Sequence, residues 1–442
     1  MSVKVCKFGG TSMADGNVIA GVKKIIESDP SRRFVVVSAP GKRYSGDIKV
    51  TDLLYACHKE AIKVGSCKNS FAQVRARFED IAKQLNLSFD ISSVLDRTER
   101  RIEQEKNEDF TASRGEYLSA RIMAEFLGAK FIDTEEVIFF TPEGNLDGAK
   151  SYKAISSAVA GCKLAVFPGF YGADENGRVK TFSRGGSDIT GSIVARAVNA
   201  SLYENWTDVS GFLACDPRIV DAPKRIKTLS YKELRELSYM GANVLHSDSI
   251  FPVRKANIPI RIKNTFRPED EGTTIVPTSR YVPSGNVVTG IAGKKNFTVI
   301  YIEKSLMNSE IGFVRKVLSV VEDEGVPIEH IPSGIDTMSL VIASDELENF
   351  RLERILEGIK NAVEPDIIRV IENIALIATV GHGMSSSVGT SARLFNAIAA
   401  ADINIKMIDQ GSSELNIVVA VKDDDYERCI KAIYREFFGR GT

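Results

Sequence analysis

The sequence predicts an α/β protein with a mainly parallel central sheet, followed by two repeated α+β units. Up to about Pro277, short apolar runs alternate with helical stretches, as in FVVVSAP (34–40), KLAVFPGFYG (163–172) and IPIRIKN (258–264). Strands separated by helices are typical of a parallel sheet. A stretch rich in Pro, Gly, Ser and Thr, 265–286, ends this pattern, and we expect a domain boundary there.

The C-terminal third contains an internal repeat. Residues 307–343 align without a gap on residues 384–420, at a constant offset of 77. Each copy reads as a strand, a loop, an amphipathic helix, a strand, a turn and another strand, which indicates a small ferredoxin-like unit with its helix packed on a sheet. We therefore expect domains at 1–286, 287–372 and 373–442, and the last two can interleave.

Composition excludes several classes of protein. The chain has 57 basic and 58 acidic residues, so no broad field favours a nucleic-acid backbone or a membrane surface. Its six cysteines are scattered without a CxxC pair, which argues against a disulfide framework or a metal cluster. No apolar run approaches the roughly 18 residues that span a bilayer. We expect a cytoplasmic protein with no nucleic-acid or membrane partner.

The first candidate site is the stretch KFGGTS, where a short strand runs into Lys7, Phe8, Gly9 and Gly10. Glycines let the backbone approach phosphate oxygens closely, and a following helix turns free N–H groups toward the same anion. Lys7 adds a point charge. The spacing matches neither the P-loop nor GxGxxG, and alone it is weak evidence for a phosphate site.

A second strand, Gly-Gly turn and helix follows in TFSRGGSDITGSIVARAV (181–198). This turn presents Arg184, Gly185, Ser187 and Asp188 at the start of a helix. Two such turns offer the cations Lys7 and Arg184 to one site, which suits a reaction between two anions.

Other segments carry polar residues for which a structural role is as plausible as a functional one. Glu116 lies near the start of a helix, where it could meet a ligand ammonium or simply face solvent. Thr207 and Asp208 end a strand, and GANVLH carries Asn243 and His246 at a helix entry. A lone histidine in such an apolar setting is more often structural than catalytic.

Together, KFGGTS, VVVSAP, the Gly115–Glu116 pair, RGGSD, WTDV with DPR, GANVLH and PIRIKNTF make the chain similar to the aspartokinases, which have the three-layer amino-acid kinase fold. The motifs occur in order along essentially the whole chain. The resemblance implies transfer of the γ-phosphoryl group of ATP to the side-chain carboxylate of aspartate, the first step toward lysine, threonine and methionine. A carboxylate is ionised at neutral pH, so it needs no general base; catalysis depends on positioning and charge.

The resemblance also implies roles for individual residues. Lys7 stabilises the migrating phosphoryl group with the amides of Gly9 and Gly10, and Asp188 orients Lys7. Arg184 holds the α-carboxylate of aspartate and Glu116 its ammonium. The remaining substrate contacts are expected from Ser38, Thr51, Gly185 and Ser187, and those to ATP from Phe8, Thr207, Asp208, Phe212, Asp216, Arg218, Asn243 and Val244. Mg²⁺ is expected between phosphate oxygens, and no protein ligand for it is predicted.

Two positions depart from the family pattern. Many relatives have a lysine where this chain has Asn243, which puts nucleotide affinity at that turn in doubt. Some relatives have Tyr where this chain has Phe212, and the loss of that hydroxyl changes little.

The repeated C-terminal units resemble a tandem of ACT domains, which bind amino acids. In that pattern the effector lies at the start of the first helix, so candidates are Met307, Asn308, Ser309, Gly312, Phe313 and Glu329, with 385–389 in the second copy. Lysine is the first choice of inhibitor because Glu310 and Glu329 could meet a second ammonium; threonine, alone or with lysine, is the alternative. A homodimer through these units is expected, with a tetramer as the other option. Two copies that only dimerise remain a structural alternative.

Two other functions remain open. A different kinase of the same fold would act on glutamate, N-acetylglutamate, carbamate or UMP. An amino-acid sensor without catalysis would have lost Lys7 or Asp188, and both are present. A fused homoserine dehydrogenase is not expected, because the chain ends soon after the second copy.

Overall fold

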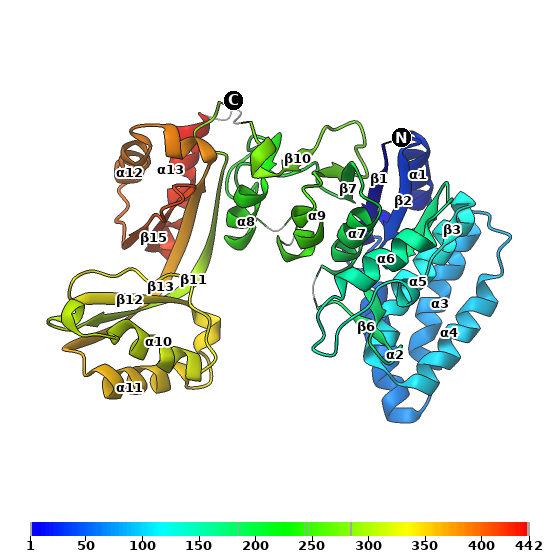
Figure 1. Ribbon diagram of the computed structural model, residues 1–442, viewed down its shortest axis with the longest axis horizontal. Helices are drawn as coiled ribbons and strands as arrows, with labels where there is room; N and C mark the ends of the chain where they lie inside the picture. Colours follow the sequence, from blue (N-terminus) through cyan, green and yellow to red (C-terminus); the bar gives the residue numbers. More distant parts are fainter. Residues whose placement is uncertain (1, 184, 243, 246, 283–284, 440–442) are drawn as a thin grey trace. The chain divides into compact units, whose positions relative to one another are not determined.

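The computed structural model describes residues 2–183, 185–242, 244–245, 247–282 and 285–439. They form two compact units, each composed of several segments. The first unit comprises Met1–Phe212, Lys227–Leu234 and Asn243–Tyr281; the second comprises Leu213–Ile226, Arg235–Ala242 and Val282–Thr442. The blue-to-green part of the ribbon in Figure 1 is mostly the first unit, and the yellow-to-red part belongs to the second.

An eight-stranded sheet forms the centre of the first unit. Its spatial order is β3 (Lys130–Phe131), β4 (Ala165–Pro168), β2 (Arg32–Val37), β1 (Lys4–Phe8), β7 (Leu202–Thr207), β9 (Ile260–Asn264), β10 (Thr273–Val276) and β8 (Thr228–Ser230). The pairs from β3 to β9 are parallel, and only the β9–β10 pair is antiparallel. The predicted mainly parallel sheet is confirmed. A separate hairpin joins β5 (Tyr171–Ala173) to β6 (Val179–Thr181).

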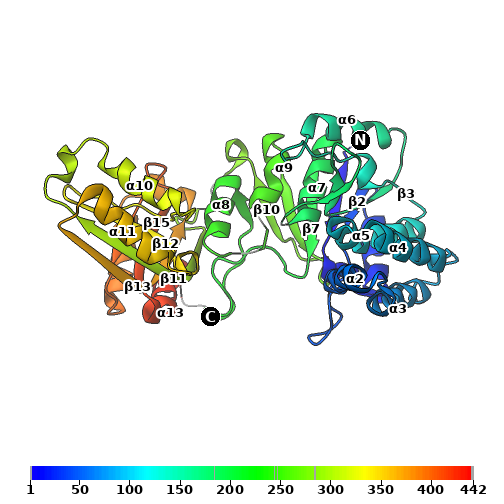
Figure 2. The same cartoon turned by 90° about the horizontal axis from the view of Figure 1, so that it is seen from below.

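Helices cover both faces of this sheet. Helix α7 packs on β1, β2 and β7, and its Gly191 lies against the Tyr203 ring, where a Cβ would come within 2.5 Å of the hydroxyl oxygen. Side chains of α1 to α5 share one continuous apolar core with strand residues of the other face. In Figure 2, α2 to α5 lie together on one side of the sheet. The helices of this unit are α1 (Gly16–Glu27), α2 (Val50–Val64), α3 (Lys68–Gln84), α4 (Ile91–Glu105), α5 (Glu108–Leu127), α6 (Gly148–Ala158), α7 (Gly186–Ala197) and α9 (Phe251–Lys255), while α8 (Tyr231–Tyr239) begins in the first unit and ends in the second.

The register of β1 and β7 decides which side chains reach which face. Lys7 pairs with Asn205, and Phe8 pairs with Trp206. Because side chains alternate along a strand, Lys7 and Asn205 share one face, while Phe8 and Trp206 share the other. The rings of Phe8 and Trp206 stack there in the core at 5.9 Å.

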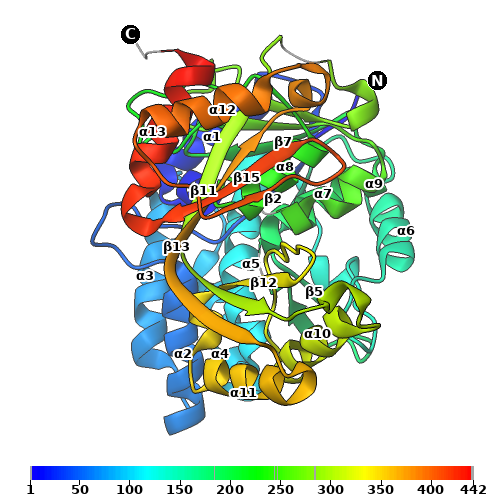
Figure 3. The same cartoon turned by 90° about the vertical axis from the view of Figure 1, so that its left-hand side faces the viewer.

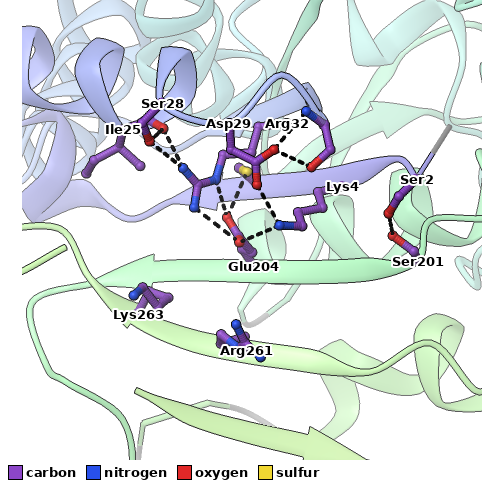
Figure 4. Close-up of polar contacts among 12 residues, drawn as sticks. Ser2, Lys4, Ile25, Ser28, Asp29, Arg32, Ser201, Glu204, Arg261 and Lys263 are labelled. Atoms are coloured by element: carbon purple, nitrogen blue, oxygen red, sulfur yellow. Dashed lines mark hydrogen bonds and ion pairs between the residues drawn. The ribbon is translucent and has the colours of Figure 1, made fainter. Parts of the chain in front are cut away.

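A buried ion cluster lies on the Trp206 face of the sheet (Figure 4). Glu204 on β7 is only 2% exposed and accepts hydrogen bonds from Arg32 Nε at 2.7 Å and Trp206 Nε1 at 3.1 Å. The Lys4 ammonium lies 3.9 Å from the same carboxylate. The cluster thus joins the three central strands β1, β2 and β7.

The second unit is built on a five-stranded sheet, in the order β12 (Thr337–Ala343), β11 (Gly290–Glu303), β13 (Ile367–Val380), β15 (Asn416–Lys422) and β14 (Met407–Asp409). β11 and β13 are long and run side by side through the whole sheet (Figure 3). The first part of β11 pairs with the part of β13 that also contacts β15, so the two repeat copies share one sheet. The helices are α10 (Phe313–Asp323), α11 (Arg351–Val363), α12 (Thr390–Ala400) and α13 (Tyr426–Phe438).

The repeat is visible in the structure with one difference. β11 and β13, and likewise α10 and α12, begin and end at positions related by the offset of the alignment. The strand expected after α10, however, is reduced to isolated bridges at His330 and Ser333, whereas the second copy has β14. Pro327 precedes this segment and Pro332 lies within it, and neither has an N–H to donate, while the second copy has Asn404 and Asp409 at the matching positions.

Within the described residues, the structure contains no helix that combines the length and the apolar character needed to span a bilayer.

Candidate active site

Two adjoining cavities open in the first unit, where the carboxyl ends of β1, β2 and β7 meet. Ligands of α/β sheets bind at this edge. The larger cavity, about 490 Å³, extends to Gly9, Gly10, Thr207, Asp208 and Val244, and the smaller, about 360 Å³, extends to Tyr55, Phe170, Ser183 and the start of α7. Both are lined by Lys7, Ser38, Thr51, Glu116 and Asp188.

Lys7 and Asp188 form an ion pair where the two cavities join. Lys7 Nζ lies 2.6 Å from Asp188 Oδ1, and both side chains are largely shielded from solvent. Asn205 Nδ2 donates a hydrogen bond to the same oxygen at 2.8 Å. Asp188 therefore holds the Lys7 ammonium in place, and Asn205 on β7 in turn holds Asp188.

The two consecutive glycines let a neighbouring loop approach the end of β1. Gly41 donates a backbone hydrogen bond to the Gly10 carbonyl at 2.8 Å, and a Cβ on Gly41 would lie 2.7 Å from the Gly10 carbonyl carbon. A Cβ on Gly10 would lie 3.2 Å from the Ala39 carbonyl oxygen. The turn is thus a place where two backbones meet at the cavity wall.

Glu116 brings a buried carboxyl group into both cavities from α5. It is 6% exposed, and its Oε2 has no hydrogen-bond partner among the described residues. Burial raises the pKa of Glu116 to about 8, against the smaller opposing effect of the Ala39 amide. An unpartnered buried carboxyl oxygen is suited to a ligand that brings a hydrogen-bond donor or a positive charge.

The second glycine turn forms the wall of the smaller cavity. Gly185 precedes α7 with φ of +59°, a conformation that glycine adopts without strain. Ser187 lies in the first turn of α7 and lines the cavity, close enough to Gly169 that a Cβ there would meet its hydroxyl at 2.5 Å.

Several predicted nucleotide residues do not line these cavities. The side chain of Phe8 is buried in the core, and Phe212 is 1% exposed, with its amide bonded to Thr273 Oγ1. Asp216 and Arg218 belong to the second unit, where they form an ion pair at 2.6 Å. Predicted site residues Arg184 and Asn243, as well as His246, lie outside the described residues.

The predicted effector residues form two groups. The side chains of Met307 and Phe313 belong to the apolar core of the first repeat copy, so only their backbones are available to a ligand. Asn308 and Ser309 are exposed, and Gly312 caps α10 with φ of +82°. Gly389 caps α12 in the same way in the second copy.

The two acids considered for a lysine effector differ in their surroundings. The Glu310 carboxylate is paired with Lys304 at 2.9 Å and with Lys316 at 2.7 Å, so a ligand ammonium would compete there with two lysines, and its contact with an effector stays a prediction. Glu329 is half-buried beside the Tyr239 hydroxyl, and burial together with this carboxylate raises the pKa of Tyr239 to about 12.

Four polar residues that line the larger cavity were not predicted as site residues: Thr11, Lys42, Lys49 and Asn205. Asn205 could have been found from strand alternation, because it precedes Thr207 by two residues and shares its face. Lys42 and Lys49 come from the loop after β2 and belong to no motif, so no signal pointed to them.

The chain matches known families along most of its length. Residues 2–264 match the amino acid kinase family, and residues 377–437 match an ACT domain. Aspartokinase 3 of Bacillus subtilis is 40% identical over 450 residues, covering 99% of each chain. The crystal structure of Clostridium acetobutylicum aspartate kinase superposes with a TM-score of 0.91 at 50% identity, covering 99% of this chain and 100% of that one.

Two crystal structures of E. coli aspartokinase III are also similar, each at 25% identity. One, in complex with aspartate and ADP (R-state), has a TM-score of 0.78 and covers 99% of this chain and 100% of that one. The other, in complex with lysine and aspartate (T-state), has a TM-score of 0.76 and covers 99% of each chain. The chain therefore belongs to the amino acid kinase family and, within it, to the aspartokinases.

Proposed function

We propose that this protein transfers the γ-phosphoryl group of ATP to the side-chain carboxylate of L-aspartate, giving 4-phospho-L-aspartate and ADP. The observation that carries the proposal is the Lys7–Asp188 pair between two cavities, one next to the glycine turn of β1 and one next to Glu116 and the start of α7. Family membership supports the same reaction.

The larger cavity is assigned to the nucleotide phosphates and the smaller to aspartate. In the transfer, a carboxylate oxygen of aspartate forms a bond to the γ-phosphorus while the bond to the β,γ-bridging oxygen breaks, and ADP leaves with that electron pair. Lys7 lies where the cavities join, so its ammonium can stabilise charge on the transferred group. Asp188 and Asn205 hold that ammonium in place.

Aspartate is bound at its ammonium by Glu116, whose free oxygen is available in the smaller cavity. Ser38, Thr51 and Ser187 line the same cavity and provide hydroxyl groups. The assignment of Arg184 to the α-carboxylate, of Gly185 to a substrate contact, and of Asp216, Arg218 and Asn243 to the nucleotide stays a prediction.

Mg²⁺ is assigned to the phosphate oxygens and their waters. Among the described residues, no group of three His, Cys, Asp or Glu side chains could hold a metal ion. Mg²⁺ keeps several waters and binds through substrate phosphates with one or two carboxylates, and Asp208 lines the larger cavity. The bound ion would neutralise charge on the phosphates.

Acceptor specificity tests this function. Purified protein is given Mg-ATP with aspartate, glutamate, N-acetylglutamate or UMP, and ADP release is measured. We expect turnover with aspartate alone, and its loss in Lys7→Ala but not in Lys24→Ala, which changes an exposed lysine of α1. Equal turnover with another acceptor, or full activity of Lys7→Ala, would overturn the assignment.

Feedback inhibition by lysine or threonine at the second unit is a further part of the proposal. The ACT match and the αL glycine caps of α10 and α12 support an amino-acid site there. An effector changes the rate only through different affinities for two states of the protein. Initial rates at fixed aspartate, with each amino acid separately and together, test the proposal, and rates unaffected by either would refute it.

A homodimer or tetramer, a cytoplasmic location and the domain bounds 1–286, 287–372 and 373–442 stay predictions.

A further inference from the structure

The loop between β2 and α2 forms one wall of the larger cavity. Its two ends are joined, because Val50 N donates a hydrogen bond to the Pro40 carbonyl at 3.2 Å. This closed loop of about ten residues has the form of an Ω-loop. In Figure 3 it is the blue segment that projects beside α3. Most of its side chains are exposed, and Asp47 is a buried exception at 8%.

The side chain of Arg77, on α3, anchors this loop through several hydrogen bonds. Its guanidinium is 5% exposed and donates to Asp47 Oδ2 at 2.6 Å. It also donates to the backbone carbonyls of Gly41 and Ile48, each at 3.2 Å. Both the first and the last part of the loop therefore bind one side chain of α3. Arg43, within the loop, completes the pairing of Asp47 at 2.9 Å.

The loop contributes two exposed lysines, Lys42 and Lys49, to the lining of the larger cavity. Within the described part of the chain, neither ammonium has an ion pair or hydrogen bond. The Lys7 ammonium, in contrast, is paired with Asp188. The loop lysines thus provide positive charge that no described carboxylate neutralises, in the cavity assigned to a nucleotide polyphosphate.

Lys49 occupies a position that is unfavourable for helix stability. It is the N-cap residue of α2, and no side chain caps the helix there. Ser, Thr, Asp and Asn are preferred at this position, and a cation is repelled by the positive end of the helix. Local rules are broken in this way mostly at functional sites. An anion bound beside the start of α2 would attract both the Lys49 ammonium and the positive end of the helix, and would so offset their mutual repulsion.

The lining of the two cavities indicates which anion would bind beside Lys42 and Lys49. Lys42 and Lys49 line the larger cavity together with Gly9, Gly10 and Thr207, and they are absent from the lining of the smaller one. The unpartnered Glu116 oxygen, which calls for a cation, lies at the boundary that both cavities share. The two lysines are thus on the nucleotide side of the site.

We propose that Lys42 and Lys49 bind the polyphosphate of the nucleotide and that Arg77 is the positioning residue that holds their loop against the cavity. The proposal rests on the assignment of the larger cavity to ATP. It predicts that the loop determines affinity for phosphate groups and leaves affinity for aspartate unchanged.

The first test compares Lys42→Ala and Lys49→Ala with Lys63→Ala, an exposed lysine at the other end of α2. Calorimetry measures the Kd for Mg-ATP and for adenosine, and initial rates measure KM for both substrates. We expect the Kd and KM for Mg-ATP to rise about tenfold in each loop variant, with adenosine binding, the KM for aspartate and Lys63→Ala unchanged; Lys49→Arg should retain most of the affinity. Unchanged Mg-ATP affinity in both loop variants, or a change confined to aspartate, would overturn the proposal.

The second test concerns Arg77. Arg77→Met should speed hydrogen exchange of the 41–49 amides and raise the KM for Mg-ATP without raising that for aspartate. In the Lys42→Ala, Lys49→Ala background it should add little further loss, because the groups that it positions are gone. A full additional loss in that background would show that Arg77 acts on the fold alone. Asp47→Asn keeps the size of the side chain and removes the charge that Arg77 binds, so it should speed the same amide exchange and raise the KM for Mg-ATP should Arg77→Met fold poorly.

The two proposals fail in different ways. Wild-type protein that binds Mg-ATP through the loop lysines but does not turn over with aspartate would refute the proposed reaction and leave the loop assignment standing. Aspartate-dependent turnover, combined with an Mg-ATP affinity that does not depend on Lys42 or Lys49, would refute the loop assignment and leave the proposed reaction standing.

Discussion

The Glu116 carboxyl has one oxygen without a partner among the described residues, and burial raises its pKa to about 8. At pH 7 the free protein therefore holds this group mostly protonated, whereas the bound ammonium of aspartate favours the carboxylate. We predict that aspartate binding at pH 7 releases a proton. Calorimetric titrations in two buffers of different ionisation enthalpy measure this release. It should vanish in Glu116→Gln, and proton uptake by the wild type would contradict the assignment.

The same carboxyl makes stability depend on pH. Its folded pKa lies above the usual value of 4.5, so the folded protein binds more protons than the unfolded chain between about pH 4.5 and pH 8. Stability from this group is therefore complete below that window and is lost as the pH rises through it. Denaturant titrations of ligand-free protein at pH 6 and pH 8 should show a smaller loss of unfolding free energy in Glu116→Gln than in the wild type. Equal losses in the two proteins would argue against a buried neutral carboxyl.

At the scale of elements, the loop after β2 makes a close backbone contact that a single methyl group would break. A Cβ on Gly41 would lie 2.7 Å from the Gly10 carbonyl carbon, whereas a Cβ on Gly46 would meet nothing closer than 3.8 Å. We predict that Gly41→Ala destabilises the fold by about 1–3 kcal/mol and weakens Mg-ATP binding, since the two backbones must separate. Gly46→Ala, in the same loop, is the matched control. Denaturant titration and calorimetry measure both effects, and similar behaviour of the two variants would contradict the contact.

The ion cluster around Glu204 joins β1, β2 and β7 on the face opposite Lys7. Its carboxylate is 2% exposed and bonds Arg32, so neutralising it leaves a shielded cation without its partner. We predict that Glu204→Gln lowers the unfolding free energy by about 3 kcal/mol. Glu27→Gln changes a carboxylate that is 59% exposed and should cost less than about 1 kcal/mol. Denaturant titration of both variants measures the difference, and equal stabilities would show that the cluster is not a structural requirement.

Over the whole molecule, features that depend on neighbouring residues could be predicted from the sequence, whereas most contacts between distant segments could not. The alternation of strands and helices, the glycine turns and the repeat were readable because each depends on neighbouring residues. The two glycine turns suggested one shared site, but the pairing of Asp188 with Lys7 came from the resemblance, since 181 residues separate them in sequence and the fold brings them to 2.6 Å.

The errors have physical causes too. Phe8 lies within the phosphate-binding motif, but strand alternation turns its ring into the core. The first repeat copy lacks its expected strand, where one proline precedes the segment and another lies within it. Lys42 and Lys49 lie in an exposed loop without a motif, and their position depends on contacts that are distant in sequence, such as those of Arg77 with Gly41 and of Gly41 with Gly10.

The central claim is that the side-chain carboxylate of aspartate attacks the γ-phosphorus in the site around Lys7. The most direct test supplies the protein with Mg-ATP, aspartate and hydroxylamine, which converts an acyl phosphate to a stable hydroxamate. We predict one equivalent of aspartyl β-hydroxamate for each ADP released, and neither product above background in Lys7→Ala. ADP release without hydroxamate would contradict it, because the phosphoryl group would then have passed to another acceptor.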